Sequence, residues 1–164
     1  MYPLISYLKF LLASTNAHGV HSPFVYGYLT RCLHQKKPGG LTATEAVLAQ
    51  SIRYFSFDGV WLFHERPQLK SKLEQQCGPI RWQPKAPQVA YLNKGLPNAF
   101  FGAAPAMAAG GMLVVPDIHK SRERFRAWKQ LLQEPRGRVT LDLFHCGVVF
   151  FGREQAKEHF TLRT

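Results

Sequence analysis

Acidic residues are scarce in this sequence of 164 residues: Asp and Glu total 10, whereas Lys and Arg total 21, which gives a formal net charge of +11. Such an excess predicts a negatively charged partner, such as nucleic acid, anionic lipid, another anionic polymer or an acidic protein surface. The basic residues are spread along the chain, so a basic surface without a ligand is the alternative. The sequence contains no recognisable nucleic-acid motif with aromatic platforms.

Cysteine is also rare, and the three present are widely spaced without a Cys-x-x-Cys pair: Cys32, Cys77 and Cys146. This spacing argues against a disulfide framework or a zinc site, and it favours a reducing cytoplasmic location. No apolar run approaches the roughly 20 residues that a membrane span needs. The apolar segment 1–14 contains Lys9 and lacks a small-residue cleavage site, so we expect a folded helix there rather than a signal peptide.

The apolar pattern divides the chain into an N-terminal helical segment, 1–56, and an α/β segment, 57–164, which we expect to fold as one unit. A hydrophobic content of 46% over this length is sufficient for a buried core. Three helices are predicted in the first segment. The first is at the N-terminus, the second begins at Pro23 after the N-cap Ser22, and the third begins at the capping box 42–45.

In the second segment, short apolar runs alternate with helical patterns. The predicted strands are 59–63, 80–82, 89–92, 112–115, 139–144 and 148–151. The predicted helices are 67–76, 98–109 and 121–133. This alternation predicts a three-layer, Rossmann-like α/β fold whose mainly parallel sheet is covered on both faces. The last two strands are joined so closely that we expect an antiparallel hairpin.

Glycine is missing from the turn after the first predicted strand, where the sequence is Phe63-His64-Glu65-Arg66-Pro67-Gln68. In domains that bind nucleotide cofactors, glycines at this turn let the backbone approach the ligand closely. Glu65 and Arg66 can instead form an ion pair that occupies the same space. The framework therefore favours a cofactor-binding domain, whereas the residues at the turn argue against one.

Two stretches carry a family resemblance: 7–26, with His-Gly-Val-His-Ser-Pro-Phe at 18–24, and 117–119 followed by 144–160. They resemble a Bacteroidetes group of class I S-adenosylmethionine-dependent methyltransferases related to the O-methyltransferases. The middle of the chain matches this group only in the order of its elements. The resemblance implies a methyltransferase-type sheet of reduced size, with S-adenosylmethionine as cofactor.

The same resemblance assigns candidate site residues. It places His64 and Glu65 at the cofactor turn, and it implies Asp117 and His119 as catalytic positions. Related metal-dependent enzymes have an aspartate where this chain has Asn93, and an acidic pair where it has a proline before Asp117. Mg²⁺ needs oxygen ligands in near-octahedral order, so Asn93 and Asp117 would form only a remnant of a metal site. We therefore expect catalysis to be impaired or lost.

A strongly basic helix is the best candidate for an anion-binding face, through Lys120, Arg122, Arg124, Arg126 and Lys129. Contact with phosphates would be sensitive to salt, and a solvated outer face is the alternative. Two functions stay open. One is a methyltransferase-like protein, and the other is a non-catalytic binding or regulatory module that contacts an anionic polymer or a partner protein. An intact relative or a second copy of the chain is a candidate partner, and affinity for S-adenosylmethionine separates the two functions.

Overall fold

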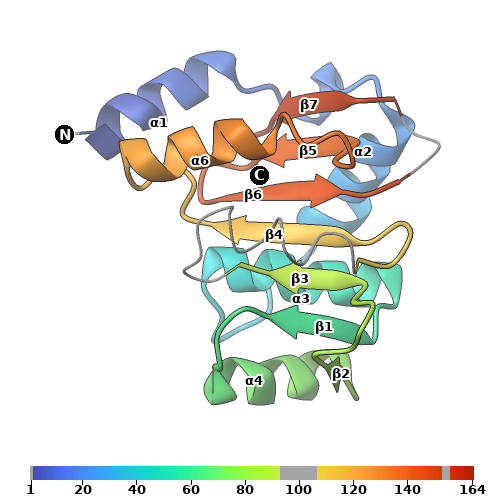
Figure 1. Ribbon diagram of the computed structural model, residues 1–164. Coiled ribbons are helices and arrows are strands. Elements are labelled where there is room, and N and C mark those ends of the chain that lie inside the picture. The colour runs from blue at the N-terminus through green and yellow to red at the C-terminus, as the bar shows by residue number, and fades with distance from the viewer. Residues whose placement is uncertain (1, 93–106, 153–155) are drawn as a thin grey trace.

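The computed structural model describes residues 2–92, 107–152 and 156–164, and its architecture is α/β (Figure 1). A seven-stranded sheet has the order β2-β1-β3-β4-β6-β5-β7. Its strands are β1 (Gly59–Leu62), β2 (Arg81–Trp82), β3 (Val89–Tyr91), β4 (Met112–Pro116), β5 (Val139–Asp142), β6 (Cys146–Phe150) and β7 (Glu158–Thr161). Strand β6 runs antiparallel to β4 and β5, and the other pairs are parallel. The mainly parallel sheet and the antiparallel hairpin of β5 and β6 are thus confirmed.

The helices begin at the predicted signals. They are α1 (Tyr2–Ala13), α2 (Pro23–Tyr28) with a π-helical continuation at Leu29–Leu33, α3 (Ala43–Phe55), α4 (Pro67–Cys77) and α6 (Arg122–Leu131). The capping box of α3 is confirmed, because Thr42 Oγ1 accepts from the Glu45 amide and the Glu45 carboxylate accepts from the Thr42 amide. Among the described residues, no helix combines the length and the apolar character needed to cross a bilayer.

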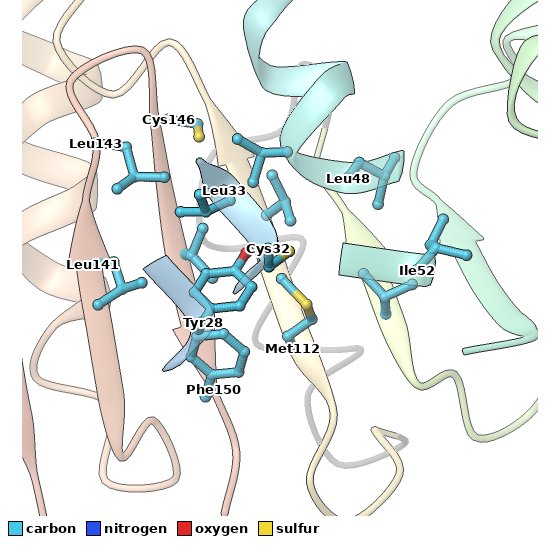
Figure 2. Close-up of a cluster of buried hydrophobic side chains, with 14 of the residues drawn as sticks. Tyr28, Cys32, Leu33, Leu48, Ile52, Met112, Leu141, Leu143, Cys146 and Phe150 are labelled. Atoms are coloured by element: carbon cyan, nitrogen blue, oxygen red, sulfur yellow. The ribbon is translucent and has the colours of Figure 1, made fainter. Parts of the chain in front are cut away.

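Helices pack on both faces of the sheet, and successive strand residues alternate between two apolar clusters. The first cluster joins strand residues to α2, α3 and α4, and Figure 2 shows part of it around Tyr28, Ile52, Met112 and Phe150. It therefore contains residues from both 1–56 and 57–164. The second cluster lies under α6, where Trp128 and Leu131 cover strand residues that include Leu113 and Val149.

Strand β7 was not predicted. It pairs in parallel with β5, and the amide of Thr15 donates to the Thr161 carbonyl at 2.9 Å, which brings the segment after α1 to the same strand. Most of β7 is only partly buried, as is common for an edge strand, so its sequence lacks the apolar alternation that marks an internal strand. Most of the helix predicted at 98–109 lies outside the described residues.

Candidate functional site

A groove of about 690 Å³ lies between α1 and α6, which run side by side at one end of the sheet (Figure 1). Strands β4 and β5 both have their carboxyl ends beside this groove. His119 follows β4, and Asp142 is the last residue of β5. Ser121 then begins α6 by accepting a hydrogen bond from the Arg124 amide at 3.2 Å. The chain thus delivers a buried histidine and a buried carboxylate to the floor of the groove.

Three polar side chains on this floor form a hydrogen-bonded chain. His119 Nε2 lies 2.7 Å from Asp142 Oδ2, and His119 Nδ1 lies 2.6 Å from Ser6 Oγ of α1. The two ring nitrogens of His119 thus each have a polar partner, one on β5 and one on α1. All three residues are buried. The chain of bonds therefore fastens α1 to the ends of β4 and β5.

Aromatic rings hold the imidazole of His119 in place. Its ring stacks on Phe144 with centroids 4.9 Å apart, and Phe125 of α6 lies 4.7 Å away. Phe144 has a left-handed backbone, with φ of 67°, and its amide donates to Asp142 Oδ1 at 2.9 Å. Asp142 thus supports both the imidazole and the aromatic ring beside it.

Four exposed cations line the mouth of the groove. Arg122, Arg126 and Lys129 follow at i, i+4 and i+7 on one face of α6, and Lys9 faces them from α1. The Arg122 guanidinium lies 5.9 Å from the centroid of the Tyr2 ring. Asp142, the carboxylate in the lining, is buried and bound to His119. The groove therefore combines a cationic mouth with a largely aromatic floor.

The order Ser6, His119, Asp142 is that of a nucleophile, a base and a group that orients the base. Acyl transfer also needs donors for the oxyanion, and these are commonly backbone amides beside the nucleophile. Ser6 lies in the second turn of α1, where the amides from Ser6 onward donate inside the helix. We therefore interpret the network as a polar part of the largely aromatic floor of a binding groove and not as a nucleophilic centre.

The turn after β1 is held by ion pairs. Arg66 reaches Glu45 of α3 with 2.9 Å between guanidinium nitrogen and carboxylate oxygen, and Glu65 pairs with Lys70 of α4 at 2.9 Å. Glu45 is buried, whereas Glu65 and His64 are exposed. The two predicted cofactor residues therefore lie on the surface, and the guanidinium of Arg66 lies at the turn where a glycine-rich loop would approach a cofactor.

The predicted catalytic and anion-binding residues are not all brought together. Asp117 is half exposed and lies 3.6 Å from Lys120 Nζ, outside the lining of the groove that holds His119. Arg124 donates to the Pro116 carbonyl at 3.2 Å and is only partly exposed. Of the five predicted anion-binding residues, the groove contains Arg122, Arg126 and Lys129. The proposed metal position Asn93 lies outside the described residues.

Most residues of the groove were not predicted as site residues, and among them are the polar residues Ser6, Lys9 and Asp142. The signal for Asp142 is its position in the otherwise apolar run 139–144, because a carboxylate in a buried strand needs a partner. Ser6 has a similar signal as a polar residue among the apolar residues of α1. The position of Lys9 beside α6 depends on how the two helices pack, and no local pattern encodes it.

Within residues 2–92, 107–152 and 156–164, no group of three or more His, Cys, Asp or Glu side chains is placed to hold a metal ion. A scan against protein-family models matches none. A search of curated proteins finds no match either.

A partly buried histidine, His145, makes the stability of the protein depend on pH. Burial, and then the charge of Lys37, lowers the pKa of His145 from its ordinary value of 6.5, and its Nε2 atom is buried without a hydrogen-bond partner in the described structure. The unfolded chain therefore binds a proton at His145 at a higher pH than the folded protein does. The contribution of the neutral His145 ring to the free energy of unfolding is fully present above pH 6.5. This contribution is lost as the pH falls through the lowered pKa.

We expect the melting temperature to fall as the pH is lowered from about 7.5 to about 5, and to fall less in His145→Gln. Circular dichroism at several pH values measures this difference. His64→Gln is the matched control, because His64 is exposed. Equal pH dependence of His145→Gln and the unchanged protein would show that His145 does not contribute.

Proposed function

We propose that this protein is a methyltransferase-like domain that has lost methyl transfer and binds an anionic ligand in the groove between α1 and α6. The family resemblance and the mainly parallel sheet with its antiparallel hairpin support a methyltransferase-like origin. The observation that carries the binding function is the convergence of four exposed cations on one groove. The two stretches of the resemblance contribute the second half of α1, His119 and strand β6, and Lys9, Phe10 and His119 from these stretches line the groove.

The composition of the groove favours a particular kind of ligand. Its mouth attracts a phosphate, sulfate or carboxylate group, because several cations close together raise the local concentration of anions. Its floor contains Phe10, Phe125 and Trp128, which bury the apolar part of a ligand. An anion attached to an apolar body therefore fits better than a small inorganic ion.

The turn after β1 supports the loss of methyl transfer. Methyl transfer needs the donor to be held in line with the acceptor, and much of the rate enhancement comes from this positioning. The turn contains no glycine, and Arg66 bonds to the buried carboxylate of Glu45. Opening the turn would leave that carboxylate without this partner, which opposes rearrangement around a cofactor. These residues do not fit S-adenosylmethionine in the usual manner, and no catalytic role is assigned to Asp117 or His119.

Calorimetric titration with phenyl phosphate, phenol and S-adenosylmethionine tests this function. We expect phenyl phosphate to bind, phenol to bind at least tenfold more weakly because it lacks the charge, and S-adenosylmethionine to give no heat at millimolar concentration. Raising the salt concentration is expected to weaken phenyl phosphate binding. S-adenosylmethionine binding tighter than roughly 100 μM, about 5.5 kcal/mol, would instead indicate a rebuilt cofactor pocket.

A matched pair of variants locates the binding site. Arg122→Gln/Arg126→Gln removes two cations from the groove, and we expect it to weaken phenyl phosphate binding at least tenfold. Lys36→Gln/Arg53→Gln also removes two cations, but these line a separate cavity between the π-helical segment and α3, and we expect this variant to bind normally. Equal binding by the two variants would place the anion site elsewhere.

A further inference from the structure

Most of the large apolar side chains of α1 lie on its solvent side. Among the described residues, five of the seven exposed large apolar side chains belong to this helix: Leu4, Ile5, Tyr7, Leu8 and Leu12. Leu4, Leu8 and Leu12 follow one another at intervals of four residues, so they form a continuous leucine stripe on one face. Leu12 is 90% exposed and Leu8 is 54% exposed. The side that faces the sheet instead contains Ser6 and Phe10.

The leucine stripe is not needed to hold α1 in place. Its attachment comes from Phe10, from the hydrogen bond of Ser6 to His119, and from the contact of Tyr7 with Phe144 at 4.9 Å between ring centroids. Exposed apolar surface that is concentrated in one patch marks a surface that binds a protein or a membrane. The stripe is therefore available to a partner.

The cations of the groove lie beside this stripe. Lys9 follows Leu8 directly, and both Lys9 and Ile5 line the wall of the groove that α1 forms. The basic face of α6, with Arg122 and Arg126, forms the opposite wall. The sequence of α1 contains no acidic residue. An apolar stripe flanked by positive charge is the pattern of helices that lie in the interface of an anionic bilayer.

We propose that α1 and the groove together dock this protein on an anionic lipid bilayer, so that lipid headgroups supply the anion of the proposed function, on which this inference rests. With 12 residues, α1 is about 18 Å long, which is too short to cross a hydrocarbon core of about 30 Å. It lies in the plane of the interface, with the leucine stripe towards the acyl chains. Lys9 and the cations of α6 then reach the phosphates beside it.

Charge favours a bilayer over a second copy of the chain as the occupant. If two copies packed with their leucine stripes in contact, the four groove cations of one copy would lie close to the four of the other. Neither copy of α1 offers a carboxylate to neutralise them. Like charges across an interface oppose association. An anionic bilayer supplies both an apolar phase and the opposite charge.

Sedimentation with lipid vesicles tests the inference on the full chain. We expect binding to vesicles of equal parts phosphatidylglycerol and phosphatidylcholine, and at least tenfold weaker binding to phosphatidylcholine alone. Leu8→Gln/Leu12→Gln should bind the anionic vesicles at least tenfold more weakly, since glutamine keeps the helix propensity but removes the apolar surface. Tyr26→Gln, at an exposed aromatic residue on α2, should bind like the unchanged protein. Circular dichroism checks that all variants are folded.

The outcomes separate this inference from the function on which it rests. If Leu8→Gln/Leu12→Gln binds phenyl phosphate normally but loses the vesicles, both proposals hold. If the unchanged protein binds phenyl phosphate but not anionic vesicles, the groove function holds and bilayer docking is wrong. Failure to bind phenyl phosphate overturns the groove function itself. A concentration-dependent dimer that Leu8→Gln/Leu12→Gln abolishes would show that a second copy covers the stripe, and would overturn bilayer docking.

Discussion

Replacing Gly147 by alanine is expected to destabilise the protein by about 1–3 kcal/mol, because the new methyl group overlaps the indole of Trp128. A Cβ atom on Gly147 would lie 2.6 Å from Cη2 and 2.8 Å from Cε3 of that ring, and closer still to Cζ3. The obstacle is a buried ring and not the end of a flexible chain. Either α6 moves outward or Trp128 leaves its position in the floor of the groove.

Urea unfolding measures this loss, and the fluorescence of the tryptophans reports a change in their surroundings. Gly39→Ala is the matched control, because nothing lies within 4 Å of its added methyl group. We expect Gly39→Ala to unfold within about 0.5 kcal/mol of the unchanged protein, as most surface substitutions do. Gly147→Ala should also bind phenyl phosphate more weakly, because Trp128, part of the floor of the groove, is displaced. Unchanged stability of Gly147→Ala would mean that Trp128 does not pack against β6.

Asp142→Ala is expected to destabilise the protein by about 3 kcal/mol, since it leaves one buried and one partly buried donor without their acceptor. One is His119 Nε2, at 2.7 Å from the carboxylate, and the other is the amide of Phe144, at 2.9 Å. Without this anchor, the imidazole loses the orientation in which it bonds to Ser6. The effect therefore extends from β5 to the attachment of α1.

Thermal and urea unfolding of three variants distinguishes this explanation from a general loss of charge. Asp142→Asn keeps an oxygen acceptor, so we expect it to lose less stability than Asp142→Ala. Asp58→Ala also removes a carboxylate, but this one is exposed and pairs with the exposed Arg81, so it should change stability little. If Asp58→Ala and Asp142→Ala were equally stable, the hydrogen-bonded chain would contribute nothing measurable.

Local signals in the sequence predicted most of the elements. The capping box at Thr42, the proline at the start of α4 and the short apolar runs of β1 and β4 each depend on neighbouring residues, so they can be recognised without a structure. The edge strand β7 was missed because it is only partly buried and shows no apolar alternation. Its position depends on pairing with β5, which starts about 20 residues earlier in the chain.

The candidate site was predicted only in part. His119 and the basic helix were recognised, but the anion-binding set changes once the side chains are placed. Arg124 bonds to the end of β4, whereas Lys9 joins from a helix more than 100 residues away in sequence. Spacing along one helix predicts which residues share a face, but it does not say which face the neighbouring helix meets.

The sequence by itself determined the net charge, most of the element types and the absence of glycine from the turn after β1, because each of these is a property of composition or of adjacent residues. Only the tertiary structure decided that Ser6, His119 and Asp142 meet, since their hydrogen bonds join residues 113 and 23 positions apart. It also decided which way α1 faces. The periodicity of α1 is equally compatible with leucines against the sheet, and it is the fit of Ser6 and Phe10 against the ends of β4 and β5 that turns the leucine stripe to the solvent.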